Sequence, residues 1–193
     1  MTVASVNVPR PAGAEGPLRL EPAAGPVDID LDGFATGPDL PPADDPAIAP
    51  ADHARTYALY AYPIAHHPFW RTVRAQARAT DGEQPLPPAS FDEHLALDGL
   101  VESRAWIGDL LRFPDCTLVV SAPRLPDARF DETLGFAHAA KMVAQSRWCG
   151  FWLAVRVPGR IAAGDAFELI PGPRINGVVE LFRSRLRGTG GWN

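Results

Sequence analysis

Two short stretches of this sequence contain side chains that can move protons. Asp127 lies in the stretch 121–130, and His94 starts the apolar run 94–97. A carboxylate in a pocket can have a raised pKa and act as a general acid or base, and histidine titrates near neutrality. Arg124, three residues before Asp127, has a guanidinium group that can bind a carboxylate or phosphate through two parallel hydrogen bonds. These residue types predict acid/base chemistry on a ligand with an anionic group, with Asp127 and His94 transferring protons.

Each of these residues also has a structural interpretation. Asp127 completes a Pro-Asp pair, which is common in solvated turns. Arg124 can bridge backbone carbonyl groups, and a lone histidine at the start of a strand is more often structural than catalytic. The sequence leaves both interpretations open for all three residues.

The elements that would position these groups are mostly short strands. Apolar runs divided by turn pairs such as Gly-Asp and Pro-Gly predict strands at 27–31, 57–62, 94–97, 110–113, 117–121, 151–157 and 166–170. Helices are predicted at 63–77, 137–147 and 178–185, and Pro63 is well placed to start the first. Many short strands with few helices indicate a mainly β fold, either a barrel or a sandwich.

The helix predicted at 63–77 carries His66 and Trp70 four residues apart, so their side chains can meet. Its apolar face is predicted to comprise Ala65, Phe69, Val73 and Ala77. Further aromatic surface near the 121–130 loop comes from Phe130, Trp148, Phe151 and Trp152. Trp70 and Trp152 are therefore predicted to shape a partly hydrophobic pocket for a small molecule, with core packing as the alternative for each ring.

Composition excludes several classes of partner. The 193 residues have a formal net charge of −5, and residues 1–52 hold nine acidic and only two basic side chains. Nucleic acid would require a clustered basic face, which this distribution does not supply. No apolar run approaches the roughly 20 residues that span a bilayer, and a secretory signal pattern is missing, so a cytoplasmic protein is expected. Cys116 and Cys149 lie in apolar stretches and predict buried thiols.

The prolines suggest how the chain is divided. Ten of the 21 prolines fall within residues 1–52, and the start of that region, residues 1–16, is predicted to be flexible. Residues 17–187 are expected to form one domain, followed by a tail at 188–193. A homodimer is left as an open alternative.

Several motifs, taken in order, resemble the MOSC domain family, the molybdenum cofactor sulfurase C-terminal domain, in its short stand-alone bacterial form. The chain has Tyr62-Pro-Ile-Ala-His-His-Pro-Phe-Trp70 where the family has Tyr-Pro-x-x-His-Tyr-x-x-Trp, and Phe91-Asp-Glu-His-Leu95 where it has Phe-Gly-Glu-Asn-Leu. The stretch 121–127 is similar to Ser-x-Pro-Arg-x-Pro-Cys. The resemblance implies a MOSC-like antiparallel β-barrel with a few peripheral helices. It also implies that His66 and Glu93 join Arg124 among the substrate-binding residues.

The chain departs from the family where that family holds cofactor-type groups. Asp127 replaces the cysteine proposed to contact the molybdenum cofactor, and Ala154 replaces an arginine. Leu20 and residues 48–50 stand at the places of a lysine and of a His-Gly-Gly segment. A thiolate is a soft metal ligand and a carboxylate is a hard one, so these changes predict loss of the molybdenum cofactor.

The sequence thus predicts a divergent MOSC-fold protein that uses no cofactor or metal and acts on a small organic molecule in specialised metabolite biosynthesis. The reaction would be an isomerisation, a cyclisation or an elimination. Two alternatives remain open. One is a molybdenum-cofactor oxidoreductase that reduces N-hydroxylated compounds, and the other is a protein that binds a small molecule without turnover.

Overall fold

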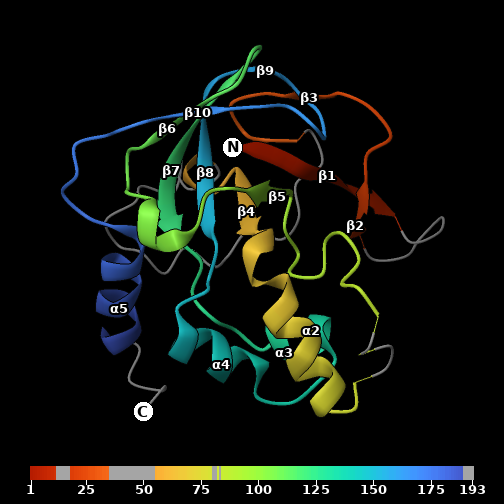
Figure 1. Cartoon of the computed structure of the whole chain (residues 1–193). Coiled ribbons are helices and arrows are strands. Elements are labelled where there is room, and N and C mark those ends of the chain that lie inside the picture. The colour runs from red at the N-terminus through yellow and green to blue at the C-terminus, as the bar shows by residue number, and fades with distance from the viewer. Residues whose placement is uncertain (12–17, 35–54, 80–81, 83, 189–193) are drawn as a thin grey trace.

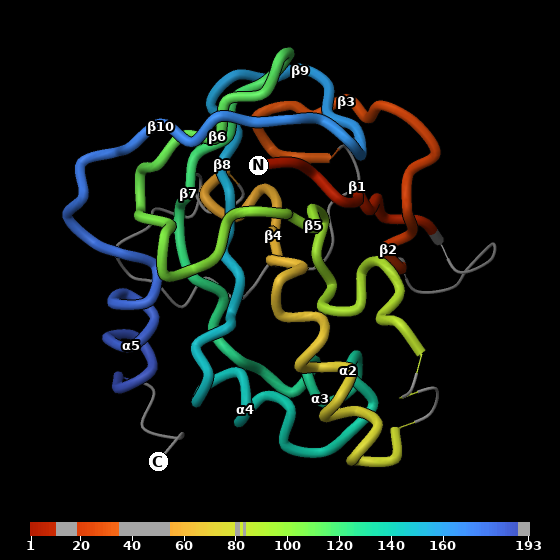
Figure 2. Tube along the Cα trace, viewed as in Figure 1, coloured from red at the N-terminus to blue at the C-terminus, as the bar shows by residue number. Residues whose placement is uncertain are grey.

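A computed structural model describes residues 1–11, 18–34, 55–79, 82 and 84–188 (Figures 1 and 2). Its strands are β1 (Thr2–Pro11), β2 (Leu18–Pro22), β3 (Val27–Ile29), β4 (Leu59–Pro63), β5 (Leu95–Asp98), β6 (Leu110–Arg112), β7 (Thr117–Pro123), β8 (Phe151–Val157), β9 (Gly159–Ile161) and β10 (Glu168–Ile170). Its helices are η1 (Ile64–His66), α2 (His67–Gln76), η2 (Glu102–Arg104), α3 (Arg129–Leu134), α4 (Ala139–Ser146) and α5 (Val178–Gly188). The fold is mainly β with a few helices, as the sequence predicts.

Eight of the strands form one sheet in the order β10-β6-β7-β8-β4-β5-β1-β2. Its neighbouring strands are antiparallel, apart from the parallel pair β4 and β5. The predicted closed barrel is wrong, because no ladder among the described residues joins the edge strands β10 and β2. An isolated bridge between Thr2 and Ala166 brings the start of β1 close to the chain before β10. Apolar runs reveal strands, but the choice between an open and a closed sheet depends on how the edges pair.

The N-terminal segment, for which the sequence predicts flexibility at 1–16, begins with a strand. Residues 2–11 form β1, which pairs with β5 on one side and β2 on the other, while residues 12–16 lie outside the described part. A bulge between Val3 and Ser5 shifts the register, and Val3 and Val6 are both buried. The bulge breaks the two-residue alternation by which strands are recognised, which is why the pattern was not visible.

The helix after β4 begins and ends close to the predicted positions, but it buries a different face. Trp70 is the one side chain of α2 that is fully buried, whereas Phe69 is 38% exposed. The predicted apolar face with Phe69 at its centre therefore does not pack against the core. Adjacent residues of a helix point about 100° apart, so a stripe at four-residue spacing cannot decide which of two neighbouring apolar side chains turns inward.

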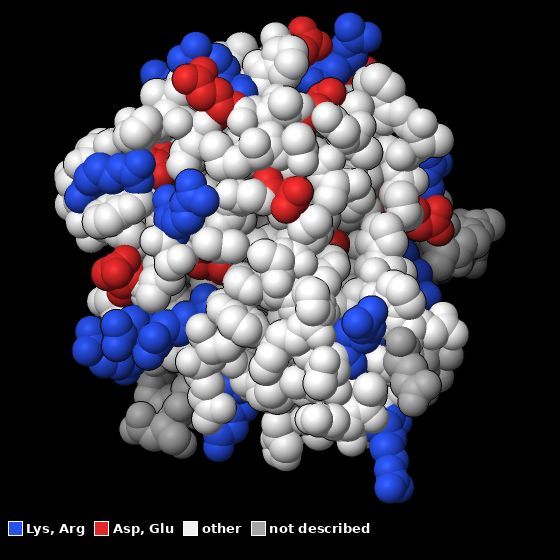
Figure 3. Space-filling view, viewed as in Figure 1, with Lys and Arg blue, Asp and Glu red and all other residues white. Residues whose placement is uncertain are grey.

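The helices are distributed unevenly around the sheet. Helices α2, α3 and α4 lie together at one end of it, and α5 lies to the side (Figure 1). In the space-filling view, basic side chains gather over α5 (Figure 3), whose last turn contains Arg185 and Arg187. Cations suit the negative end of the helix dipole, so this basic group has a structural explanation. No helix in the described ranges is long and apolar enough to cross a membrane.

Candidate functional site

The end of the sheet at which β7 ends and β8 begins faces α2, α3 and α4 (Figure 1). The pairing of β7 with β8 reaches Pro123 and Phe151 at this end. Arg124 therefore comes directly after β7, and Gly150 comes directly before β8. The neighbouring strand β4 contributes Tyr60 and Tyr62, both fully buried. Loops that are far apart in the sequence therefore meet around two buried tyrosines.

Asp127 lies at the surface, in the loop before α3. Its side chain is 50% exposed, and its Oδ1 accepts a hydrogen bond of 2.9 Å from the backbone N–H of Arg129. Its Oδ2 lies 3.6 Å from Nη2 of Arg124. A carboxylate that binds an N–H in the first turn of a helix stabilises the start of that helix. The structure therefore gives Asp127 a structural role and leaves it accessible to a ligand.

Arg124 is buried beneath this loop. Its guanidinium lies between two aromatic rings, 4.8 Å from the centroid of Tyr60 and 4.4 Å from that of Phe130. Nη1 donates a 2.8 Å hydrogen bond to the carbonyl oxygen of Phe91. This half of the guanidinium therefore has the structural role that the sequence left open as an alternative. Nη2 faces the partly exposed carboxylates of Asp127 and Asp92, at 3.6 and 3.8 Å.

Asp92 is a charged neighbour that sequence reasoning missed. Its Oδ2 lies 3.8 Å from Nη2 of Arg124 and 3.5 Å from Nε of Arg129. That oxygen is buried and has no hydrogen-bond partner among the described residues. Burial raises the pKa of Asp92, although the two guanidiniums act in the opposite direction. The signal was present in the sequence, because Asp92 stands where the resemblance places a glycine, and its φ is 55°.

Glu93 supports the loop from below and does not line its surface. The fully buried carboxylate accepts hydrogen bonds from the backbone N–H groups of Ala89, at 2.8 Å, and Phe91, at 2.9 Å. Burial raises the pKa of Glu93 to about 7, although these backbone hydrogen bonds act to lower it. Glu93 therefore holds the turn that presents Asp92. A direct contact between Glu93 and a substrate stays a prediction that its burial does not favour.

His94 is enclosed between strands. It is 1% exposed, and its Nδ1 accepts a 2.8 Å hydrogen bond from the backbone N–H of Tyr60. Burial, and then the charge of Arg124, lowers the pKa of His94 to about 3. Its Nε2 and the Oδ1 of Asn7, on the adjacent strand, are buried atoms that find no partner in the described ranges. The imidazole is neutral near pH 7, so its predicted role in proton transfer is not the one that this environment favours.

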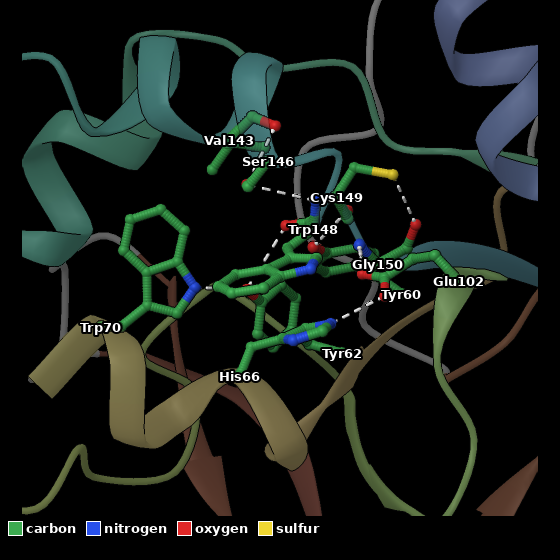
Figure 4. Close-up of polar contacts among 10 residues, drawn as sticks. All are labelled: Tyr60, Tyr62, His66, Trp70, Glu102, Val143, Ser146, Trp148, Cys149 and Gly150. Atoms are coloured by element: carbon green, nitrogen blue, oxygen red, sulfur yellow. Dashed lines mark hydrogen bonds and ion pairs between the residues drawn. The ribbon is translucent and has the colours of Figure 1, made fainter.

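His66 has a different environment at the start of α2. Its Nε2 lies 2.8 Å from Oε2 of Glu102, and its ring stacks on Trp148 with 4.4 Å between centroids and 10° between planes (Figure 4). Nδ1 makes no hydrogen bond within the described part of the chain. The side chain is 9% exposed. One ring nitrogen is thus fixed by a carboxylate, and the other is left for a ligand.

Glu102 is the second functional candidate that sequence reasoning missed. It is 2% exposed, and its Oε1 accepts a 2.8 Å hydrogen bond from the backbone N–H of Gly150. Gly150 has a φ of 62°, and a Cβ there would lie 2.5 Å from the carbonyl oxygen of Ala61, so only glycine fits. Thirty-six residues separate Glu102 from His66, and no local pattern reveals such a pair.

The two predicted tryptophans are core residues. Trp70 is fully buried, and its Nε1–H donates a 2.7 Å hydrogen bond to the hydroxyl of Tyr62. That hydroxyl in turn donates to the carbonyl oxygen of Trp148 at 3.3 Å (Figure 4). Trp152 is 6% exposed and packs against Tyr60. Both rings match the alternative of core packing, and Trp70 acts on the site only through Tyr62 and Trp148.

An open, mainly antiparallel sheet with helices and a charged loop at one end defines a β-rich domain whose candidate site lies beyond β7 and β8. A sequence profile of the MOSC domain matches residues 47–168, which is more than half of the chain. The chain belongs to the MOSC domain family. This confirms the resemblance seen in the sequence.

Individual relatives agree with this assignment. Protein YiiM of Escherichia coli strain K12 is 30% identical over 113 residues, or 58% of this chain and 48% of YiiM. The matched region therefore spans about half the length of that relative. A crystal structure of YiiM from Geobacillus stearothermophilus has a TM-score of 0.73 at 20% identity, covering 98% of this chain and 86% of that one. A crystal structure of YiiM from Escherichia coli has a TM-score of 0.68 at 22% identity, covering 94% and 76%. These similarities show the fold.

The donor groups at this site do not fit the family's proposed cysteine contact to a molybdenum cofactor. Position 127 holds a carboxylate bound to a backbone N–H. Both cysteines are buried, as predicted, and burial raises the pKa of Cys116 to about 12 and that of Cys149 well above its ordinary value. Neither is placed to supply a thiolate. Ala154 is half-buried on β8 and Leu20 lies on β2, while residues 48–50 are outside the described part.

Proposed function

We propose that this chain catalyses proton transfer on a small organic molecule without a cysteine–molybdenum contact, with His66 as the acid/base group. The observation that supports this most is the pairing of His66 Nε2 with the buried carboxylate of Glu102 at 2.8 Å. A carboxylate on one ring nitrogen fixes the tautomer and stabilises the imidazolium that forms when the other nitrogen takes a proton. The stack on Trp148 restrains the plane of the ring.

The reaction that suits this pair is a proton shift. Nδ1 of His66 takes a proton from a C–H, N–H or O–H group of the substrate, and the bonding electron pair stays on the substrate. The imidazolium then returns the proton to another substrate atom, or, in an elimination, a leaving group departs with its bonding electron pair and takes up that proton. Isomerisation, cyclisation and elimination all follow this course and need no external oxidant or reductant.

The charged loops supply the neighbouring binding groups. Arg124 is retained from the family motif, and its Nη2 lies beside the half-exposed Asp127, so it is our candidate for holding an anionic group of the substrate. Asp127 is a second candidate for proton transfer, because it is half exposed beside that guanidinium. His94 and Glu93 take the role of supporting residues in this proposal.

Deuterium exchange tests the proposal across many candidate substrates at once. The protein is incubated in D₂O with a library of small carboxylic, keto, hydroxy and amino acids, and loss of C–H signals is followed by NMR. We expect exchange in at least one compound, and a loss of about 100-fold or more in His66→Asn. His138→Asn is the matched control, because His138 is exposed and its side chain takes no part in the site.

Two outcomes would contradict the proposal. Stoichiometric molybdenum in protein made in a host that synthesises the cofactor would favour the oxidoreductase alternative. Saturable binding of a library compound, without exchange or any other conversion, would favour a non-catalytic binding protein.

A further inference from the structure

We infer that the loops carrying Asp92 and Arg124 form a recognition site for a small zwitterion with an ammonium and a carboxylate, as in an α-amino acid. This names the substrate class of the proposed enzyme and so rests on the proposed function for its catalytic meaning. Binding itself can be measured without turnover.

The four charged groups of this site make long contacts with one another. Three ion pairs among Asp92, Arg124, Asp127 and Arg129 have N–O distances of 3.8, 3.6 and 3.5 Å. Hydrogen bonds between a guanidinium and a carboxylate are usually about 2.7–2.9 Å long. These three contacts therefore bring opposite charges near each other without reaching the length of a short hydrogen bond.

Asp92 is held in its place at a cost. Its backbone has a φ of 55°, in the left-handed region that favours glycine, and Ala89 in the same turn has a φ of 63°. Its Oδ2 has no hydrogen-bond partner in the part of the chain that the structure describes, although the side chain as a whole is 29% exposed. Sparsely populated backbone conformations cluster at functional sites, and an unpaired buried carboxylate oxygen can accept a further contact.

A zwitterion satisfies both signs of charge at once. Its carboxylate accepts hydrogen bonds from Nη2 of Arg124, and its ammonium donates to Asp92. Two short charge-assisted contacts then replace the long ion pairs. A simple anion would bring its charge close to two carboxylates, and a simple cation would bring its charge close to two guanidiniums. A ligand that has both charges therefore fits better than a ligand with only one.

The zwitterion site connects to the His66–Glu102 pair through buried rings. Arg124 lies over Tyr60 and binds the carbonyl oxygen of Phe91. The Phe91 ring stacks on Tyr62 with 3.8 Å between centroids, and the Tyr62 ring lies edge-on to His66 at 5.8 Å. Side chains that position the two sites are thus in direct contact.

Binding measurements with matched ligands test this inference. The common α-amino acids are titrated up to about 10 mM by NMR and calorimetry, together with the amine and the carboxylic acid that lack one of the two charges. We expect at least one amino acid to bind about tenfold or more tightly than both of its single-charge analogues. We also expect Asp92→Asn and Arg124→Lys each to weaken that binding about tenfold or more.

Two variants separate loss of binding from loss of folding. Asp92→Gly removes the carboxylate and relieves the positive φ, so it should fold at least as well as the unchanged protein and still lose binding. Asp115→Asn is the control, because Asp115 forms an exposed ion pair with Arg160 outside the site. The inference is overturned if no amino acid binds, if the single-charge analogues bind equally well, or if Asp92→Gly binds normally.

Failure of this inference can be told apart from failure of the proposed function. His66→Asn should retain amino-acid binding while it loses exchange. Binding without exchange in the unchanged protein would remove the catalytic proposal and leave the zwitterion site. Exchange that depends on His66 but acts only on compounds with one charge would remove the zwitterion site and leave the catalytic proposal.

Discussion

His66 and His94 are both buried, but the two imidazoles have different partners. Nε2 of His66 meets the carboxylate of Glu102 at 2.8 Å. Nδ1 of His94 accepts a backbone N–H, its Nε2 has no partner in the described ranges, and burial lowers its pKa to about 3. The comparison teaches that two histidines of similar burial differ in the groups that surround them: a carboxylate faces His66, and a backbone N–H faces His94.

The two histidines also differ in what surrounds them. His66 is buried where a helix begins, and its ring stacks on that of the half-buried Trp148. His94 lies between the first, fourth and fifth strands, where its backbone bonds to both Asn7 and Tyr60. A neutral ring that completes a sheet needs only to be enclosed.

The largest expected effect comes from removing the partner of His66. Glu102→Ala leaves the N–H of Gly150 and the ring of His66 without their acceptor in a buried site, so we expect a loss of about 3–5 kcal/mol in unfolding free energy. Chemical denaturation monitored by tryptophan fluorescence measures it. Glu102→Gln is the companion variant, because it keeps an acceptor for Gly150. A loss below about 1 kcal/mol in Glu102→Ala would show that the pair is not a fixed element.

The next effect concerns acid unfolding and His94. A histidine whose pKa is about 3 when folded and about 6.5 when unfolded contributes stability above pH 6.5 that is lost as the pH falls toward 3. Between pH 7 and pH 4.5 we expect it to account for about 2–3 kcal/mol of lost stability. His94→Asn should remove most of that loss in urea titrations at the two pH values.

Two other histidines bear on the pH dependence expected for His94. His138→Asn serves as the control, because His138 is exposed. His67, with a pKa lowered to about 4 by burial, contributes a loss of the same sign that remains in both variants. If the unfolding free energy of His94→Asn depended on pH as strongly as that of the unchanged protein, His94 would not have the lowered pKa that its burial implies.

The smallest of the three effects has the opposite sign and comes from Glu93. Its pKa is about 7 in the folded protein, against an ordinary value of 4.5, so its contribution to stability is complete below pH 4.5 and is lost as the pH rises through 7. We expect a decrease of about 2 kcal/mol between pH 5 and pH 8. Glu93→Gln should flatten this limb while leaving the acid limb of His94 in place. A steeper alkaline limb in Glu93→Gln would contradict the assignment.

Much of the framework could be read from local patterns. The predicted strands at 117–121 and 151–157 are found as Thr117–Pro123 and Phe151–Val157, and the predicted helix at 137–147 is found as Ala139–Ser146. The motif around Arg124 indicated the family, and the same motif showed that a carboxylate replaces its cysteine. Such features are local because strand and helix periodicity is set by neighbouring residues.

The tertiary structure alone decided how the chemical groups are paired. Residue types made Asp127 and His94 the candidates, but folding encloses His94 and puts Glu102 beside His66 from 36 positions away. Folding also makes Asp92 a candidate site residue, because it brings two guanidiniums beside a turn in which Asp92 has a positive φ. The sequence by itself determined the family, the main elements and the loss of the cysteine. Partners, burial and pKa values depend on groups that meet only when distant segments pack together, and for that reason only the folded chain could decide them.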